Sequence, residues 1–266
     1  MAEAERAGQS WSDLRAQLYD WECFHVLGRT DQDVAFWLDV AKNAPGSCLE
    51  LASGTGRVSL RLADAGIDVV GLDLDPSMLA FAARQQAKAG RLQQGRARFL
   101  AGDMRQFSLH ESFGAVLIPY NSIQLLTEAT DQRACLTLAA AHLAGSGVVG
   151  LEVTDFQQGA TRMAVDDEVI HRGWLGHDQV TLIGSLTHDL EARLSWYRRR
   201  FVTSAWTVED EAAIRSVNQS ELAHLLTLTG LAPLRWWTSG AVTRVVAAPS
   251  PALSSSRCRD EHRERR

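Results

Sequence analysis

Four short polar segments follow apolar stretches in the first half of the chain, and their residue types suit the binding of a nucleoside. The first, Glu50-Leu-Ala-Ser-Gly-Thr-Gly56, is a glycine-rich turn in which the backbone can approach a ligand closely. Asp73 ends the second apolar stretch, and a carboxylate there can accept hydrogen bonds from both hydroxyls of a ribose. Asp103, in Leu100-Ala-Gly-Asp-Met104, can accept one from an adenine amino group.

Further residues around these segments complete the predicted site. Leu74 and Met104 can sandwich an adenine ring between them. The fourth segment, Ile118-Pro-Tyr-Asn-Ser122, follows another apolar stretch, where the reactive end of the ligand would lie. These positions predict a single ligand site built from four loops.

The elements that must position these loops are strands alternating with helices. We predict strands at 48–52, 68–73, 97–101, 113–119 and 147–154, and the helices between them at 58–65, 75–88 and 128–143. This alternation predicts a doubly wound parallel sheet with helices on both faces. In such a sheet, ligands bind at the carboxyl ends of the strands, which is where all four segments fall.

The rest of the chain departs from this rhythm. Residues 11–42 are predicted to be helical with an interruption at Gly28. After Phe156 we expect an insertion with antiparallel strands at 180–186 and 193–202. A helix at 218–229 and a closing hairpin then follow; the hairpin strands are 234–238 and 241–247.

Three motifs resemble one known family. LELASGTGRVSLRLADAGIDVVGLDLDPSMLAFA, RFLAGDMRQF and FGAVLIPYNSIQLL resemble the class I S-adenosylmethionine (SAM)-dependent methyltransferases, in their bacterial small-molecule branch. The resemblance covers Tyr19 to Thr154 well, the closing hairpin loosely and the insertion poorly. The family's glycine pattern is acid-x-Gly-x-Gly-x-Gly, from which Ala52 departs.

The resemblance implies the cofactor SAM, with S-adenosylhomocysteine (SAH) as its product, and the role of each matching residue. Gly54 and Gly56 would approach the methionyl part, Asp73 the ribose and Asp103 the adenine, while Glu50 would act through water or loop hydrogen bonds. The expected cofactor-binding residues are Glu50, Ala52, Ser53, Gly54, Gly56, Asp73, Leu74, Met78, Gly102, Asp103, Met104, Pro119 and Tyr19.

The resemblance also implies a Rossmann-like sheet of seven strands whose last strand is antiparallel. With the predicted elements, this gives an α/β fold with an N-terminal helical cap and a small antiparallel β insertion. The expected parts are the cap (1–45), the SAM-binding core (46–155), the insertion walling the substrate pocket (156–205), the C-terminal part of the core (206–248) and a disordered tail (249–266).

Methyl transfer from a sulfonium is an in-line displacement that needs alignment and a dry cavity more than it needs a base. The reaction therefore does not require a catalytic base. The candidates for a catalytic residue are Tyr19, Tyr120, His171 and His177. The substrate candidates are Tyr120, Asn121, Asp155 and Trp174, with Trp21 and Glu152 nearby. Each has a structural alternative: helix packing for Tyr19 and Trp21, a solvated loop for the histidines, and solvated strand ends for Glu152 and Asp155.

The composition of the chain indicates which kinds of binding partner to expect. The net charge of −5 disfavours a nucleic-acid substrate. The four cysteines form no CxxC pair and have no zinc-like histidine spacing, so we expect neither a metal site nor disulfides. No apolar run is long enough to span a bilayer, and the first residues do not resemble a signal peptide. We expect a cytoplasmic enzyme, monomeric or homodimeric, that acts on a small molecule.

Three other functions remain open from the residues. A methyltransferase that acts on protein or RNA is one of them, disfavoured by the acidic charge balance and the absence of a basic appendage. An NAD(P)-dependent oxidoreductase would use a G-x-G-x-x-G loop, but Ser59 stands at its third glycine position. A protein with the SAM-binding fold can also catalyse another reaction or only bind SAM, because fold does not fix chemistry. The acceptor atom is not readable from the sequence; the resemblance suggests a step in secondary-metabolite biosynthesis.

Overall fold

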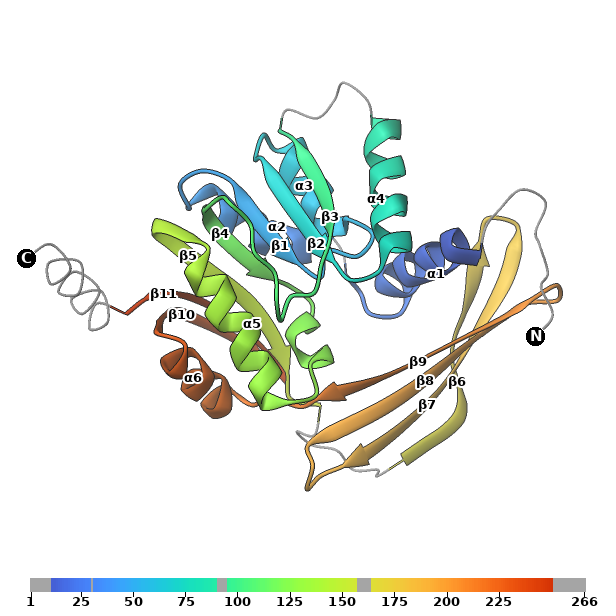
Figure 1. Cartoon of the computed structure of the whole chain (residues 1–266). Helices are drawn as coiled ribbons and strands as arrows, with labels where there is room; N and C mark the ends of the chain where they lie inside the picture. Colours follow the sequence, from blue (N-terminus) through green and yellow to red (C-terminus); the bar gives the residue numbers. More distant parts are fainter. Residues whose placement is uncertain (1–10, 30, 90–94, 157–163, 251–266) are drawn as a thin grey trace, which may run out of the picture.

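The structure is a computed structural model that describes residues 11–29, 31–89, 95–156 and 164–250 (Figure 1). It consists of a seven-stranded sheet covered by helices and a separate four-stranded sheet at one side (Figure 1). The helix α1 (Trp11–His25) lies between the small sheet and α4 (Pro76–Ala89), which flanks one edge of the main sheet (Figure 1).

The main sheet has the strand order β10-β11-β5-β4-β1-β2-β3. Its strands are β1 (Cys48–Leu51), β2 (Val69–Asp73), β3 (Ala97–Ala101), β4 (Phe113–Ile118), β5 (Leu143–Thr154), β10 (Leu231–Ser239) and β11 (Val242–Pro249). Strands β1 to β5 pair in parallel, and β11 runs antiparallel to both β5 and β10. The predicted α/β fold, with a seven-stranded sheet and an antiparallel last strand, is confirmed.

Helices cover both faces of this sheet, which explains the unbroken apolar runs of its central strands. On one face, Leu49 and Val116 pack with α5 (Ala129–Ala141) and α6 (Gln219–Leu228). On the other, Cys48 and Leu117 pack with α2 (Asp31–Lys42) and α3 (Arg57–Asp64). Successive residues of one strand therefore enter opposite halves of the core.

The N-terminal region divides where the sequence indicated. The helix α1 ends before Gly28, whose φ of +58° is a conformation that glycine adopts without strain, and α2 begins soon afterwards. One face of α1 packs Leu14, Leu18 and Trp21 against the small sheet. Within the predicted helical cap, α1 thus lies between the small sheet and α4, whereas α2 covers one face of the main sheet.

The small sheet has the strands β6 (Ala164–Leu175), β7 (Asp178–Asp189), β8 (Leu194–Val202) and β9 (Thr207–Arg215), all antiparallel. The pairing of 180–186 with 193–202 was predicted, and β7 and β8 confirm it. The structure extends the small sheet to Arg215, beyond the boundary expected after residue 205. The expected tail from 249 falls outside the described residues except for the end of β11 and Ser250.

Charge pairing explains why β6 and β9 were not recognised. The Asp166-Asp167 segment of β6 forms ion pairs across β7 with arginines of β8, for example Asp167 with Arg200 at 3.1 Å. The acidic run Glu209–Glu211 of β9 lies opposite the basic run Arg198–Arg200 of β8. Opposite charges on facing strands stabilise the pairing, so these strands need no clear apolar alternation.

Gln124 joins the small sheet to the main one. It lies in the short 3-10 helix η2 (Ser122–Leu125) after β4 and is fully buried. Its amide nitrogen donates to the carbonyl oxygens of Thr154 (2.8 Å) and Arg215 (2.7 Å), and its oxygen accepts from the Thr154 N–H (2.7 Å). One side chain thus fixes the ends of β5 and β9 beside the loop that follows β4.

We predict that Gln124→Leu lowers the free energy of unfolding by about 3 kcal/mol, because it leaves buried backbone groups unsatisfied. Urea unfolding followed by circular dichroism measures this change. The control is Gln179→Leu, at an exposed position on β7, which should change stability by less than about 0.5 kcal/mol. If Gln124→Leu lowers the free energy of unfolding no more than the control does, Gln124 does not hold the ends of β5 and β9 together.

Candidate functional site

The turn after β1 is held by residues in the left-handed backbone region. Ala52, Gly54 and Gly56 have φ values of 56°, 53° and 78°. A Cβ at Gly56 would come within 3.0 Å of the Phe99 ring, so both conformation and space favour glycine there. Ala52 stands at the first glycine of the family pattern and adopts the conformation that glycine would, at a cost of order 1 kcal/mol.

Asp73 lies directly beside this turn. Its carboxylate accepts hydrogen bonds from the Gly54 N–H (2.7 Å) and the Asp75 N–H (2.9 Å). Burial raises the pKa of Asp73, while these two backbone donors act in the opposite direction. The Gly102 N–H donates to the Asp73 carbonyl oxygen at 2.9 Å, so the loops after β1, β2 and β3 are linked through one residue.

Glu50 is buried behind the turn rather than exposed in the site. It is 2% exposed and accepts a hydrogen bond from the Ser59 hydroxyl at the start of α3. Burial raises its pKa to about 7, against the opposing effects of the Ser59 hydrogen bond and the Arg57 charge. Glu50 therefore lies behind the turn and is bonded to a residue of α3, and its expected role toward the cofactor stays a prediction.

Asp103 projects from the loop after β3 with its carboxylate already engaged. The Arg105 N–H and side chain both bind it, with Arg105 Nη2 2.6 Å from Oδ2, and hydrogen bonding to Arg105 lowers the pKa of Asp103. Arg105 is held in turn by Asp131 at 3.0 Å. Of the two predicted adenine-flanking side chains, Leu74 is exposed and Met104 is partly buried against the core; Met78 is half-buried on α4.

The loop after β4 carries Tyr120 in a strained backbone conformation. Tyr120 and Asn121 have φ values of 61° and 58°, which are uncommon for residues with side chains. The Asn121 side chain accepts from the Thr154 hydroxyl (2.8 Å), and the Ser122 hydroxyl donates to the buried Pro119 carbonyl (2.7 Å). These contacts hold the conformation that turns the Tyr120 ring toward α1.

Two tyrosine rings meet at this point. The Tyr19 ring of α1 packs edge-on against Tyr120, with centroids 6.2 Å apart, and the Cys23 thiol contacts the Tyr120 hydroxyl at 3.7 Å. Burial raises the pKa of both tyrosines well above the ordinary value. Both hydroxyls therefore stay protonated at neutral pH. Asp20 accepts from the Thr55 hydroxyl at 2.7 Å, which ties α1 to the glycine turn.

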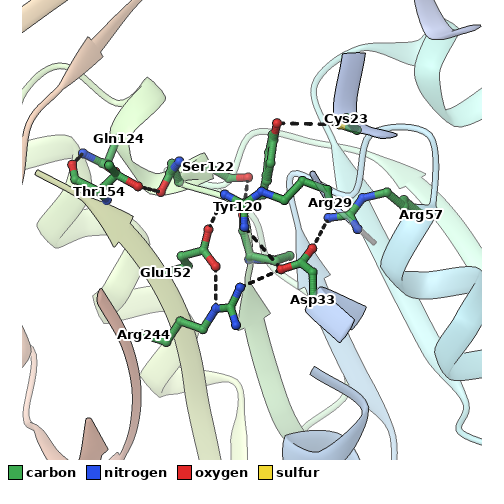
Figure 2. Close-up of polar contacts among 12 residues, drawn as sticks. Cys23, Arg29, Asp33, Arg57, Tyr120, Ser122, Gln124, Glu152, Thr154 and Arg244 are labelled. Carbon is green, nitrogen blue, oxygen red and sulfur yellow. Dashed lines mark hydrogen bonds and ion pairs between the residues drawn. The ribbon is translucent and has the colours of Figure 1, made fainter. Parts of the chain in front are cut away.

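A buried group of charges lies behind Tyr120 (Figure 2). We call it the arginine cluster; it comprises Arg29, Arg57 and Arg244 with Asp33 and Glu152. Asp33 contacts Arg57 at 2.8 Å and Arg244 at 2.7 Å, and Glu152, with no exposure, contacts Arg29 at 2.7 Å and Arg244 at 2.6 Å. With three cations and two anions, the cluster carries one excess positive charge.

The arginine cluster also contacts the site. The Arg29 guanidinium lies 4.3 Å from the centre of the Tyr120 ring, and Arg57 directly follows Gly56. The Arg57 Nη1 atom is buried and has no hydrogen-bond partner among the described residues. No local sequence pattern marks Arg29 or Arg244, and only the position of Arg57, next to the glycine turn, is a signal. Glu152 is fully buried and is not a solvated strand-end acid.

The remaining candidates have partners elsewhere. His171 lies on β6 against the rings of Trp21 (5.4 Å) and His25 (6.2 Å), and His177 is exposed at the turn that follows. Trp174 is 62% exposed, and its carbonyl accepts from the Trp21 indole N–H. Asp155 accepts from the Ser216 hydroxyl at 2.7 Å. Among the described residues, His171 and Trp174 contact α1 and the neighbouring strand β7 of the small sheet.

The segment that carries these loops is similar to known methyltransferases. Residues 48–147 match the methyltransferase-domain family. The glycine/sarcosine N-methyltransferase of Parasynechococcus marenigrum is 31% identical over 56% of this chain and 51% of its own length. A dTDP-3-amino-3,6-dideoxy-alpha-D-glucopyranose N,N-dimethyltransferase of Streptomyces fradiae is 36% identical over 46% of each chain. The matches span about a third to a half of each curated relative.

Among solved structures, an S-adenosylmethionine-dependent methyltransferase from Clostridium acetobutylicum superposes with a TM-score of 0.74 at 13% identity. That alignment covers 89% of this chain and 99% of the other. Residues 48–147 therefore match a methyltransferase domain, and the described chain shares the fold of a solved SAM-dependent methyltransferase. The curated relatives that it resembles include bacterial N-methyltransferases of small molecules.

Two structural findings bear on partners. Among residues 11–29, 31–89, 95–156 and 164–250, no helix is long and apolar enough to cross a membrane. Over the same ranges, no three His, Cys, Asp or Glu side chains lie close enough together to hold a metal ion.

We predict that Glu50 makes the ligand-free protein less stable as pH rises. Its folded pKa, about 7, lies above the ordinary value of 4.5, so the folded state retains a proton that the unfolded state releases. Its contribution is fully present below pH 4.5 and is lost as pH rises through 7, by roughly 3 kcal/mol in total.

Urea unfolding of wild type and Glu50→Gln at pH 5 and pH 8 measures this effect. Glu50→Gln should lose most of the difference between the two pH values, whereas Glu211→Gln, at an exposed position on β9, should keep it. Parallel pH dependences for wild type and Glu50→Gln would contradict the role of the buried carboxyl.

Proposed function

We propose that the chain binds SAM at the loops after β1, β2, β3 and β4 and transfers its methyl group to the nitrogen of a small, amine-bearing acceptor. The observation that carries the proposal is the junction at which Asp73 binds the Gly54 N–H, with Arg57 immediately after the turn. This arrangement offers an acceptor for ribose hydroxyls and a cation for a carboxylate within one site.

The fit of SAM rests on the chain's own residues. The arginine cluster has one unbalanced positive charge, and Arg57 Nη1 is a buried donor without a partner in the described chain. The methionyl carboxylate of SAM would neutralise the excess positive charge and accept a hydrogen bond from Arg57 Nη1. Both contacts favour SAM binding, because a buried polar group without a partner is costly. Asp73 would hold the ribose, and Asp103 would accept from the adenine amino group with lone pairs that Arg105 leaves free.

The chemistry asks little of acid–base groups. SAM supplies an activated methyl group whose sulfur leaves without charge. Tyr19 and Tyr120 line the approach with apolar ring faces that exclude water, and their raised pKa values keep them as neutral hydrogen-bonding groups rather than bases. A neutral amine needs no deprotonation before it attacks, so nitrogen is the acceptor that suits this site best.

The relatives support the same class of acceptor. Both named relatives are N-methyltransferases, one for glycine and sarcosine and one for a nucleotide-linked aminosugar. We infer that the acceptor is a small amine in a biosynthetic pathway. The resemblance to the bacterial small-molecule branch favours a pathway of secondary metabolism. Incubation with methyl-labelled SAM and both amine classes tests this; SAM binding without methylated product from either would favour the non-methylating alternative.

We predict that Asp73→Ala weakens SAM binding at least about 100-fold, because two charge-assisted hydrogen bonds to the ribose are lost. Isothermal titration calorimetry with SAM measures this, with Asp64→Ala, at an exposed position on α3, as the matched control. An unchanged dissociation constant in Asp73→Ala would remove Asp73 from the site. Tight NADH binding by the wild type, without a SAM signal, would favour an oxidoreductase.

We also predict that Arg57→Met discriminates between two ligands. SAH carries the amino-acid carboxylate, and 5′-methylthioadenosine lacks it. Arg57→Met should weaken SAH binding about 10- to 100-fold, while 5′-methylthioadenosine binding changes less than about 2-fold. Arg61→Met, one turn further along α3, is the control for general effects of losing a charge. Equal losses for both ligands would exclude a specific contact with the carboxylate.

A further inference from the structure

A small hollow opens between α1 and the inner face of the small sheet. Its walls include Tyr19 and Glu22 of α1, with Arg199 of β8 and Asp210 of β9 opposite. Its volume is about 40 Å³, which is room for roughly three water-sized groups. The hollow can therefore hold one end of a small molecule, such as an amine and its carbon, but not the whole of a sugar.

The polar groups in the hollow form a connected set. Glu22 is 6% exposed and binds Arg199, and Arg199 also binds Asp210. Arg15 contacts Asp210 at 3.4 Å from the solvent side. Arg199 thus fixes the Glu22 carboxylate, whose remaining lone pairs can accept from a ligand N–H. The Arg199 Nε atom is buried without a hydrogen-bond partner in the described chain, so the set is not saturated.

The hollow adjoins the place where transfer would occur. Tyr19 lines it and packs against Tyr120, at the end of β4. The negative charge of Glu22 is among the causes that raise the pKa of Tyr120, and Cys23, the next residue, touches the Tyr120 hydroxyl. A group that enters the hollow therefore lies against Tyr19, whose ring packs on Tyr120 beside the proposed SAM site.

We propose that this hollow receives the amine-bearing end of the acceptor and that Glu22 accepts a hydrogen bond from the acceptor nitrogen. The inference rests on the proposed function. The amine enters as its ammonium, which a buried carboxylate binds more tightly than it binds a neutral hydroxyl. The ammonium loses one proton to solvent, a remaining N–H points to Glu22, and the freed nitrogen lone pair attacks the methyl carbon. The N–CH₃ bond forms as the S–CH₃ bond breaks, the bonding pair remains on sulfur, and the product leaves as its ammonium.

The test compares amine and hydroxyl ligands by isothermal titration calorimetry on the SAH-saturated full chain. The probes are dTDP-3-amino-3,6-dideoxyglucose against dTDP-6-deoxyglucose, and glycine against glycolate. At least one amine should bind wild type about tenfold or more tightly than its hydroxyl partner, and this preference should fall below about twofold in Glu22→Gln. If neither pair favours the amine in wild type, or if Glu22→Gln keeps the preference, the inference is wrong.

Two controls separate the contact from general damage. Glu209→Gln, exposed on the same sheet, should keep the amine preference. Asp210→Asn removes the other partner of Arg199 and should also keep the amine preference. If Asp210→Asn loses this preference as fully as Glu22→Gln does, the preference depends on the ion pairs, and a direct contact between Glu22 and the amine is excluded. SAH affinity is measured in every variant: absent binding in wild type defeats the proposed function, whereas intact binding without amine preference defeats only this inference.

Discussion

The buried arginine cluster is the constraint on which the arrangement of the site depends. It joins the segment after α1, the helices α2 and α3, and the strands β5 and β11 behind a single tyrosine ring. Charges with so little exposure are tolerated only while all are paired, since removing one partner from a buried ion pair is strongly destabilising. The cluster therefore fixes the N-terminal cap on the sheet and the Tyr120 loop above it together.

Several residues at the strand ends are held in strained backbone conformations by the contacts around them. Ala52, Tyr120 and Asn121 adopt conformations that residues with side chains rarely take, and each lies at a strand end beside the candidate ligand site. Such conformations persist only where surrounding contacts impose them. For the loop after β4 those contacts are the Asn121–Thr154 and Ser122–Pro119 hydrogen bonds and the packing of Tyr19.

The sequence predicted what local pattern and chain order determine. The parallel strands, the break at Gly28, the glycine turn and the position of Asp73 all follow from periodicity and turn chemistry. Trp236 and Trp237, adjacent on the predicted strand 234–238, pack against the main core and Phe36 respectively. What could not be predicted is pairing across long separations: Arg244 binds Asp33 from 211 positions away, and no local signal marks that pair. The polar strands β6 and β9 were missed because their partners, not their own patterns, stabilise them.

The two walls that meet at Tyr19 come from different parts of the architecture. The loops of the main sheet form one wall, whereas the inner face of an appended sheet forms the other, joined to the first chiefly through Gln124 and α1. The side chains that line the small sheet can therefore differ in size and polarity while the turn after β1 keeps its backbone conformation. Such a division separates the choice of what enters the hollow from the geometry of the glycine turn.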